Sequence, residues 1–178
     1  MKSILRIGIL SLIALFAASS MALAQDRGGK KARPSPNATI SQTIGTTVVT
    51  VTYGRPGLKG REIQSLLPTG KVWRTGANES TAITFSSDVT VAGKAIKAGT
   101  YSLYTIPGEK EMTIIINSKM SWGTQYDKAQ DVARASVSVH GGDFVEWFAI
   151  DFDTLSDSKA HMNLHWGDYW VAVPIEVQ

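Results

Sequence analysis

The densest group of side chains able to do chemistry lies in residues 54–80, between two segments with the alternation of strands. This stretch is broken by glycine and proline and carries arginine, lysine, asparagine and glutamate. Arginine forks bind carboxylate, phosphate or sulfate through paired hydrogen bonds, and asparagine and glutamate can orient a hydroxyl-rich ligand. A small polar or anionic ligand, or a glycan, is therefore the expected partner. The predicted ligand-binding residues are Arg55, Lys59, Arg61, Trp73, Arg74, Asn78 and Glu79.

The same residues support other interpretations. In a purely structural one, Glu79 pairs with one of the arginines of this stretch and pins the loop to the body of the protein. In a catalytic one, Glu79 is a general acid or base, with Asp127 or Asp131 as the second carboxylate. In a third, Trp73 and Trp122 are stacking platforms for sugar rings. The residues leave these alternatives open, and they favour a protein without catalytic activity.

Metal binding is a weaker interpretation of the histidines. His161 and His165 fall on one face of a predicted strand, where two imidazoles could share a metal with Asp168. Alternation alone predicts the same pattern, with a solvated histidine face opposite a buried apolar face formed by Met162, Leu164 and Trp166. The chain also has no nucleophile motif, phosphate-cradling glycine loop or cysteine pattern. We therefore expect no metal and no cofactor.

The N-terminus has the pattern of an export signal. Lys2 and Arg6 precede an apolar run over residues 7–17, and Ala22-Leu23-Ala24 follows as a cleavage site. The run is shorter than the roughly 20 residues of a membrane-spanning helix. Residues 1–24 are thus predicted to be a signal peptide, which leaves no transmembrane segment after cleavage. With no cysteine in the chain, it cannot be a lipoprotein, and a periplasmic or extracellular location is expected.

The charge of the chain argues against nucleic-acid binding. Lysine and arginine number 18 against 15 acidic residues, but residues 34–178 hold 12 basic and 14 acidic side chains. A duplex-binding surface needs a positive field to displace counterions from phosphates. Residues 25–36 are basic and contain glycine and proline, so they are predicted to form a flexible leader. Residues 37–178 are long enough for a single domain with its own core. The oligomeric state is not indicated.

The body of the chain alternates with the period of β-strands. The clearest case is residues 47–53, where Val49, Val51 and Tyr53 share one face. Turn residues separate the predicted strands, notably at residues 140–143 and 166–168. We therefore predict an all-β fold, an antiparallel, jelly-roll-like β-sandwich. Its strands are predicted at residues 47–53, 81–85, 88–91, 101–106, 112–117, 134–139, 145–152, 161–166 and 170–177.

Helix is scarce in this pattern. One helical turn is predicted at residues 62–67, where Pro68 stops it, and another at residues 127–132, where Asp127 can cap the start. The connection over residues 54–80 is long for a compact domain. It carries apolar anchors, so an ordered loop folded over one edge or end of the sandwich is expected.

Five motifs of the chain are distinctive: Arg55-Pro56, Lys59-Gly60-Arg61-Glu62-Ile63, Val72-Trp73-Arg74-Thr75-Gly76-Ala77-Asn78-Glu79-Ser80-Thr81, Ala98-Gly99-Thr100-Tyr101-Ser102-Leu103 and Ile106-Pro107-Gly108. With these motifs the chain resembles a family of exported bacterial proteins catalogued as a domain of unknown function, number 2911. The resemblance covers roughly residues 35–176 and implies a secreted, β-rich single domain with no established activity. It marks as positions of the family signature Arg55, Lys59, Gly60, Arg61, Trp73, Arg74, Gly76, Asn78 and Glu79.

These observations converge on one expectation. The chain is predicted to be an exported, non-catalytic envelope protein that binds a small polar or anionic ligand, or an envelope component, through residues 55–79. The alternatives are an envelope hydrolase that uses Glu79, and a carbohydrate-binding module that uses Trp73 and Trp122.

Overall fold

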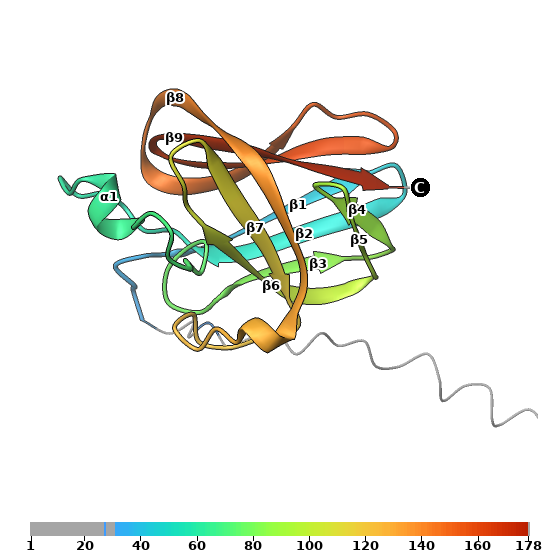
Figure 1. The fold of residues 1–178 in the computed structure, drawn as a ribbon, viewed down its shortest axis with the longest axis horizontal. Helices are drawn as coiled ribbons and strands as arrows, with labels where there is room; N and C mark the ends of the chain where they lie inside the picture. The colour runs from blue at the N-terminus through green and yellow to red at the C-terminus, as the bar shows by residue number, and fades with distance from the viewer. Residues whose placement is uncertain (1–26, 28–30, 178) are drawn as a thin grey trace, which may run out of the picture.

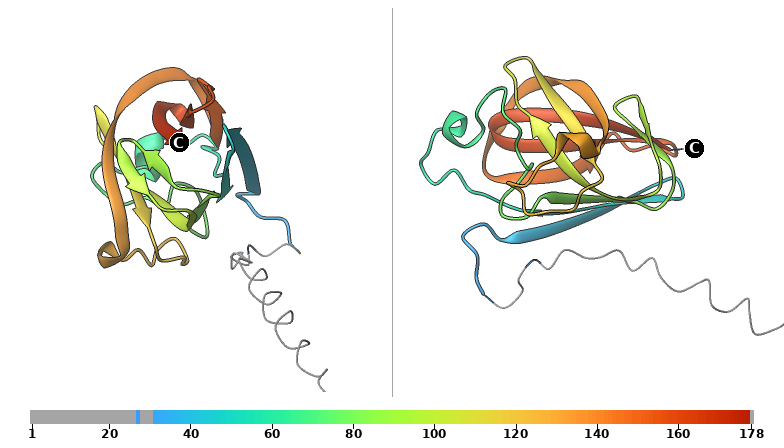
Figure 2. Two further views of the ribbon diagram at one scale, coloured as in Figure 1. Left: turned by 90° about the vertical axis from the view of Figure 1, so that its right-hand side faces the viewer. Right: turned by 60° about the horizontal axis from the view of Figure 1, so that its bottom comes forward.

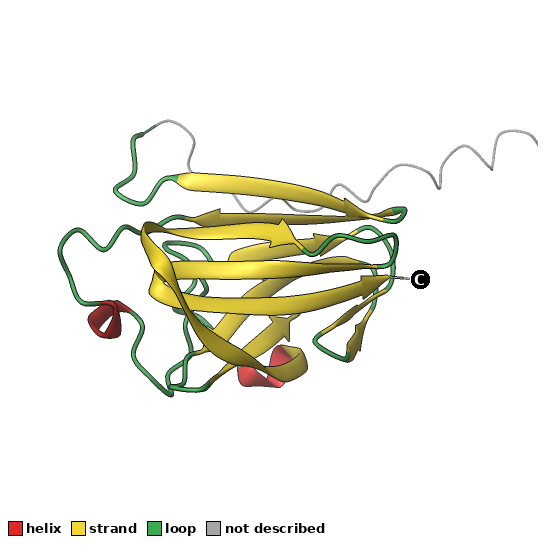
Figure 3. Cartoon of the chain, turned by 90° about the horizontal axis from the view of Figure 1, so that it is seen from above, coloured by secondary structure: helices red, strands yellow, loops and turns green. Residues whose placement is uncertain are grey.

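The computed structural model describes residue 27 and residues 31–177. The export signal predicted at residues 1–24, with its cleavage site after Ala24, lies outside these residues. The regular elements of the described chain are strands, apart from two short helical segments at its periphery (Figure 3). The bounds predicted for the leader and for the single domain stay predictions.

Nine strands pair in the order β1-β2-β3-β6-β7-β8-β9-β4-β5, and every pair is antiparallel. Figure 1 shows β8 running from the bottom of the view, beside the short helical turn at Lys128–Gln130, to β9 at the top. The strands are β1 Asn37–Ile44, β2 Thr47–Gly54, β3 Thr81–Phe85, β4 Val89–Val91, β5 Lys94–Ile96, β6 Gly99–Ile106, β7 Glu111–Asn117, β8 Asp131–Asp153 and β9 Lys159–Val177.

The all-β class is confirmed, but the strands form one sheet. Two separate sheets, as the predicted jelly-roll-like sandwich requires, are not seen among the described residues. The reason is the 23-residue length of β8. Its first part pairs with β7 as far as Ser138, and its remainder pairs with β9 from Val139 onward. In both views of Figure 2, β8 (orange) connects the β7 and β9 parts of the sheet.

The turns predicted at residues 140–143 and 166–168 are wrong. Both segments lie inside strands, β8 and β9 respectively. Gly141 pairs with Tyr169 and Val145 with Gly167, so β8 has two more residues than β9 between these pairs. Such an irregularity bends a strand without ending it. The glycines at these positions therefore form part of a bulge rather than a turn. Gly167 has a φ of 62°, in the left-handed region that glycine adopts without strain.

The sequence pattern missed the two strands at the ends of the sheet. β1 and β5 each pair on one side only in the strand order. β5 has three residues, too few to show a period. β1 carries polar side chains on its exposed face, and edge strands of this kind avoid uncontrolled pairing with other chains. The weak apolar signal of both strands follows from their edge positions.

Alternation predicted the core-facing side chains correctly. Val49, Val51 and Tyr53 of β2 are 0%, 0% and 3% exposed. They join one hydrophobic core that also includes Ile83 of β3 and Val173 of β9. The two parts of the sheet connected by β8 thus contribute to the same core.

The two helical turns are confirmed. α1 spans Ile63–Leu66 and ends before Pro68, where a proline ring would clash with a continuing helix. The 3-10 turn η1 spans Lys128–Gln130, and the Asp127 side chain accepts a hydrogen bond of 3.0 Å from the Ala129 N–H. This bond satisfies a backbone donor at the start of the turn.

Candidate functional site

The long loop, residues 55–80, lies at the end of the fold opposite the C-terminus (Figure 1). Its two ends meet, because the Ala77 N–H donates to the Gly54 carbonyl at 3.2 Å. A Cβ atom at position 54 would lie 2.4 Å from the Ala77 oxygen, so this approach requires glycine. Three isolated backbone bridges tie the loop to the rest of the fold: Gly57–Trp147, Trp73–Thr105 and Glu79–Trp122.

The predicted site residues fall into two groups, and the first lies against β8. Arg55 donates its Nε to the Phe148 carbonyl at 2.8 Å. The backbone N–H of Lys59 donates to Glu146 Oε1 at 2.6 Å. The Lys59 ammonium lies 5.4 Å from the centre of the Trp147 ring, within the range of a cation–π interaction. These contacts fasten the first half of the loop to β8.

The side chains of Arg61 and Trp73 also make contacts inside the protein. Arg61 donates Nη2 and Nε to the carbonyls of Gly57 and Leu58, at 2.8 and 2.9 Å. The Trp73 ring stacks on Trp166, with a centroid distance of 5.7 Å and an interplanar angle of 14°. One face of Trp73 is therefore covered by another aromatic ring and is not open to a sugar.

The second group consists of Arg74, Asn78 and Glu79, which lie beside residues 121–123. The Gly123 N–H donates to the Asn78 carbonyl at 3.2 Å. Trp122 is 50% exposed, so of the two predicted aromatic platforms it is the one that faces solvent. No hydrogen bond or ion pair among the described residues joins this group to Arg55, Lys59 or Arg61.

Glu79 is the most buried charge of the second group, at 2% exposure. Its carboxylate is held by both ends of the Arg33 fork, with Nη1–Oε2 at 2.8 Å and Nη2–Oε1 at 2.9 Å. Burial alone would raise the pKa of Glu79, but the hydrogen bonds and charge of Arg33, with the charge of Arg27, hold it below its usual value. Glu79 is thus ionised at neutral pH.

Arg33 and Arg27 are the site residues that sequence reasoning missed. Both belong to the predicted leader, and the partner expected for Glu79 was an arginine of the loop itself. Arg27 donates Nη2 to the Ser80 carbonyl at 2.7 Å. The one signal in the sequence for this pairing was the surplus of basic residues before β1, which could neutralise the acidic residue of the family signature.

Arg74 has no acidic partner among the described residues. It is half-buried, and its Nε is buried without a hydrogen-bond partner. Burial lowers the pKa of Arg74, an effect that Tyr104 opposes. The aliphatic part of the side chain lies on Gly123: a Cβ built there would come within 2.0 Å of Arg74 Cδ. The fold therefore holds a guanidinium in place without neutralising it.

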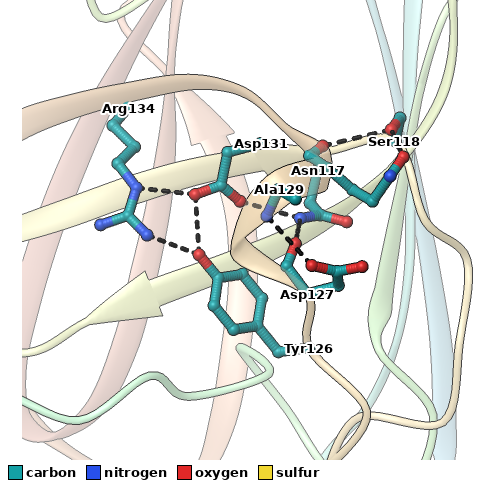
Figure 4. Close-up of polar contacts among 8 residues, drawn as sticks. Asn117, Ser118, Tyr126, Asp127, Ala129, Asp131 and Arg134 are labelled. Carbon is teal, nitrogen blue, oxygen red and sulfur yellow. Dashed lines mark hydrogen bonds and ion pairs between the residues drawn. The ribbon is translucent and has the colours of Figure 1, made fainter.

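A separate polar network occupies the neighbouring connection, residues 118–130 (Figure 4). Asp131 accepts hydrogen bonds from Asn117 Nδ2 at 2.8 Å, from Tyr126 Oη at 2.7 Å and from Arg134 Nε at 2.7 Å. With three donors on its carboxylate, Asp131 anchors this connection to β7 and β8. Asp127 caps η1. Both carboxylates proposed as partners of Glu79 are thus engaged elsewhere.

His161 and His165 lie on β9, apart from both groups. The apolar face predicted opposite them is confirmed, because Met162, Leu164 and Trp166 are each at most 3% exposed. The His165 ring lies beside the Trp170 ring, with 5.8 Å between the two ring centroids. Across the described part of the chain, no three histidine, cysteine or acidic side chains are placed to hold a metal ion.

No helix in the described residues is both long and apolar enough to cross a membrane. Neither curated proteins nor solved structures give a match to this chain. A comparison with protein families matches residues 35–175 to the family described as "Protein of unknown function (DUF2911)". This match confirms the resemblance and covers most of the chain. The chain therefore belongs to the DUF2911 family.

Proposed function

We propose that this protein is a non-catalytic component of the cell envelope that binds a small anionic or acidic sugar ligand beside Arg74 and Trp122. The observation that carries the proposal is the guanidinium of Arg74, which has no acidic partner among the described residues. Such a cation is a ready partner for carboxylate, phosphate or sulfate. The exposed ring of Trp122 next to Gly123 offers a stacking surface.

The state of Glu79 supports binding over hydrolysis. A general acid must carry a proton near neutral pH, and catalytic carboxylates commonly have a raised pKa. The pKa of Glu79 is lowered instead, and both of its oxygens accept bonds from Arg33. Each oxygen already accepts one of these bonds, and Glu79 is 2% exposed, so a substrate has little access to the carboxylate. Predicted export supports an envelope ligand over a cytoplasmic one.

The experiment compares charged and neutral glycans. The purified protein is applied to an array of envelope glycans with carboxylate, phosphate or sulfate groups and their neutral counterparts, and hits are titrated by calorimetry. The informative variants are Arg74→Met, which keeps the aliphatic contact with Gly123, and Trp122→Ala. Lys94→Ala on β5 is the matched control, because it removes an exposed cation at one edge of the sheet.

Loss of acidic-glycan binding in Arg74→Met, with unchanged melting temperature and with normal binding by Lys94→Ala, supports the site. Equal binding of neutral and acidic glycans, or equal loss in Lys94→Ala, contradicts it. Turnover of a glycan by the wild-type protein that disappears in Glu79→Gln, while the variant stays folded, favours the hydrolase instead.

A further inference from the structure

Residues 33–36 of the leader lie along the loop over residues 55–80. We propose that this loop forms a binding site for an arginine-bearing, proline-containing peptide, and that residues 33–36 of the same chain fill it. This inference concerns a contact different from the Arg74 surface and does not depend on the proposed function. Four residues of the loop contact the segment, namely Arg55, Lys59, Asn78 and Glu79.

Arg33 is the anchor of the bound segment. Its guanidinium makes two parallel bonds of 2.8 and 2.9 Å to a carboxylate that is 3% exposed. A planar fork facing both carboxylate oxygens selects arginine over lysine, because an ammonium cannot make the same pair of bonds. The buried position of Glu79 also makes an empty site costly, since an unpaired carboxylate would lose its compensation. Glu79 therefore requires a cationic occupant.

The backbone of the segment fits the donors of the loop. The carbonyl of Pro36 accepts from the Arg55 N–H at 2.8 Å. The carbonyls of Pro34 and Ser35 accept longer bonds, from Lys59 Nζ at 3.4 Å and from Asn78 Nδ2 at 3.5 Å. The segment presents three carbonyl acceptors, and the loop presents three donors. Prolines at positions 34 and 36 have no N–H, so the occupant brings few donors that would need partners.

The sequence of the segment lowers the cost of binding. A residue that precedes proline is biased toward extended backbone, and this restriction applies to both Arg33 and Ser35. A segment whose backbone is already restricted by prolines loses less conformational entropy when it binds. Arg27 adds a second guanidinium contact, with the carbonyl of Ser80 at 2.7 Å. An arginine followed by alternating prolines is thus the chemical class of ligand that this loop accepts.

The test supplies the segment as a separate peptide. A fluorescent peptide with the sequence of residues 31–37 is titrated into the full chain carrying Arg33→Ala, and binding is followed by anisotropy. The tethered segment of this variant lacks its anchor, so the site is open to the peptide. Control peptides carry Arg33→Lys or Arg33→Ala. A second protein variant combines Arg33→Ala with Glu79→Gln. Circular dichroism verifies folding, and Arg33→Gln replaces Arg33→Ala if the latter does not fold.

We expect saturable binding of the wild-type peptide, weakened at least about tenfold by either peptide substitution and by Glu79→Gln. The unmodified protein should bind it more weakly than the Arg33→Ala variant, because its own segment competes at an effective concentration of about millimolar. Absence of binding, or equal binding of all three peptides, overturns the inference. Failure of both Arg33 variants to fold also overturns it, because the segment is then an inseparable part of the fold.

Discussion

The pair of Glu79 and Arg33 gives the sharpest prediction for stability. Replacing Glu79 with glutamine keeps the shape of the side chain and removes its charge. Removing one partner of a fully buried ion pair costs about 3–5 kcal/mol. Arg33 keeps 22% of its side chain exposed, so water can take up part of its lost interaction. We therefore expect Glu79→Gln to lower the free energy of unfolding by about 2–3 kcal/mol at pH 7.

The pH dependence of the stability contributed by Glu79 follows from the direction in which its pKa is shifted. The pKa of Glu79 is lowered in the folded state, so folding favours the charged form. The resulting stability is complete above the pKa of glutamate in the unfolded chain, and it is lost as the pH falls through the lower pKa of the folded state. The difference between wild type and Glu79→Gln should thus be full at pH 7 and shrink below about pH 4.

Urea denaturation followed by tryptophan fluorescence measures these free energies. A double-mutant cycle with Glu79→Gln and Arg33→Ala isolates the pair, and we expect a coupling of about 1.5–2 kcal/mol. The matched control is the exposed pair of Asp88 and Lys97, with an N–O distance of 2.7 Å, whose coupling should be smaller and more sensitive to salt. A coupling below about 0.5 kcal/mol, or a cost of Glu79→Gln that stays constant down to acid pH, would refute the reasoning.

Three further substitutions test other contacts by the same denaturation assay. Gly123→Ala places a methyl group 2.0 Å from Arg74 Cδ and should cost about 1–3 kcal/mol; no loss of stability would show that Arg74 does not lie on this glycine. Asp131→Asn weakens a carboxylate that accepts three bonds and should cost about 1–2 kcal/mol, whereas an unchanged midpoint would contradict an anchoring role. Tyr53→Phe leaves the buried Ile150 N–H without its 2.9 Å acceptor and should cost about 1–3 kcal/mol; a neutral result would mean that the N–H finds another partner.

Local pattern predicted much of the fold. β3 has the predicted bounds, and the inward face of β2 is the predicted one. A strand that buries one face must alternate apolar and polar residues, so neighbouring residues in the sequence are enough to predict which face is buried. The cap of η1 by Asp127 was predictable for a similar reason, because the hydrogen bond spans two residues.

The continuity of β8 was not predictable from local pattern. Gly141 and Gly142 have the composition of a turn, and a bulge uses the same residues. The choice between turn and bulge depends on whether a partner strand follows the chain past these glycines. β9 does so, with a shift in register between Gly141 and Val145. That partner begins at Lys159, beyond the reach of any local signal.

The candidate site, too, was predictable in part from the sequence and was determined in part only by the tertiary structure. The sequence alone identified residues 55–80 as an unusual polar stretch and carried the motifs of the DUF2911 family, because composition and order are properties of the chain itself. The tertiary structure decided that Glu79 pairs with Arg33, 46 residues away, and that Arg74 keeps no acidic partner among the described residues. Opposite charges in a sequence can combine in many ways, and only the path of the segment before β1 along the loop brings Arg33 within reach of that carboxylate.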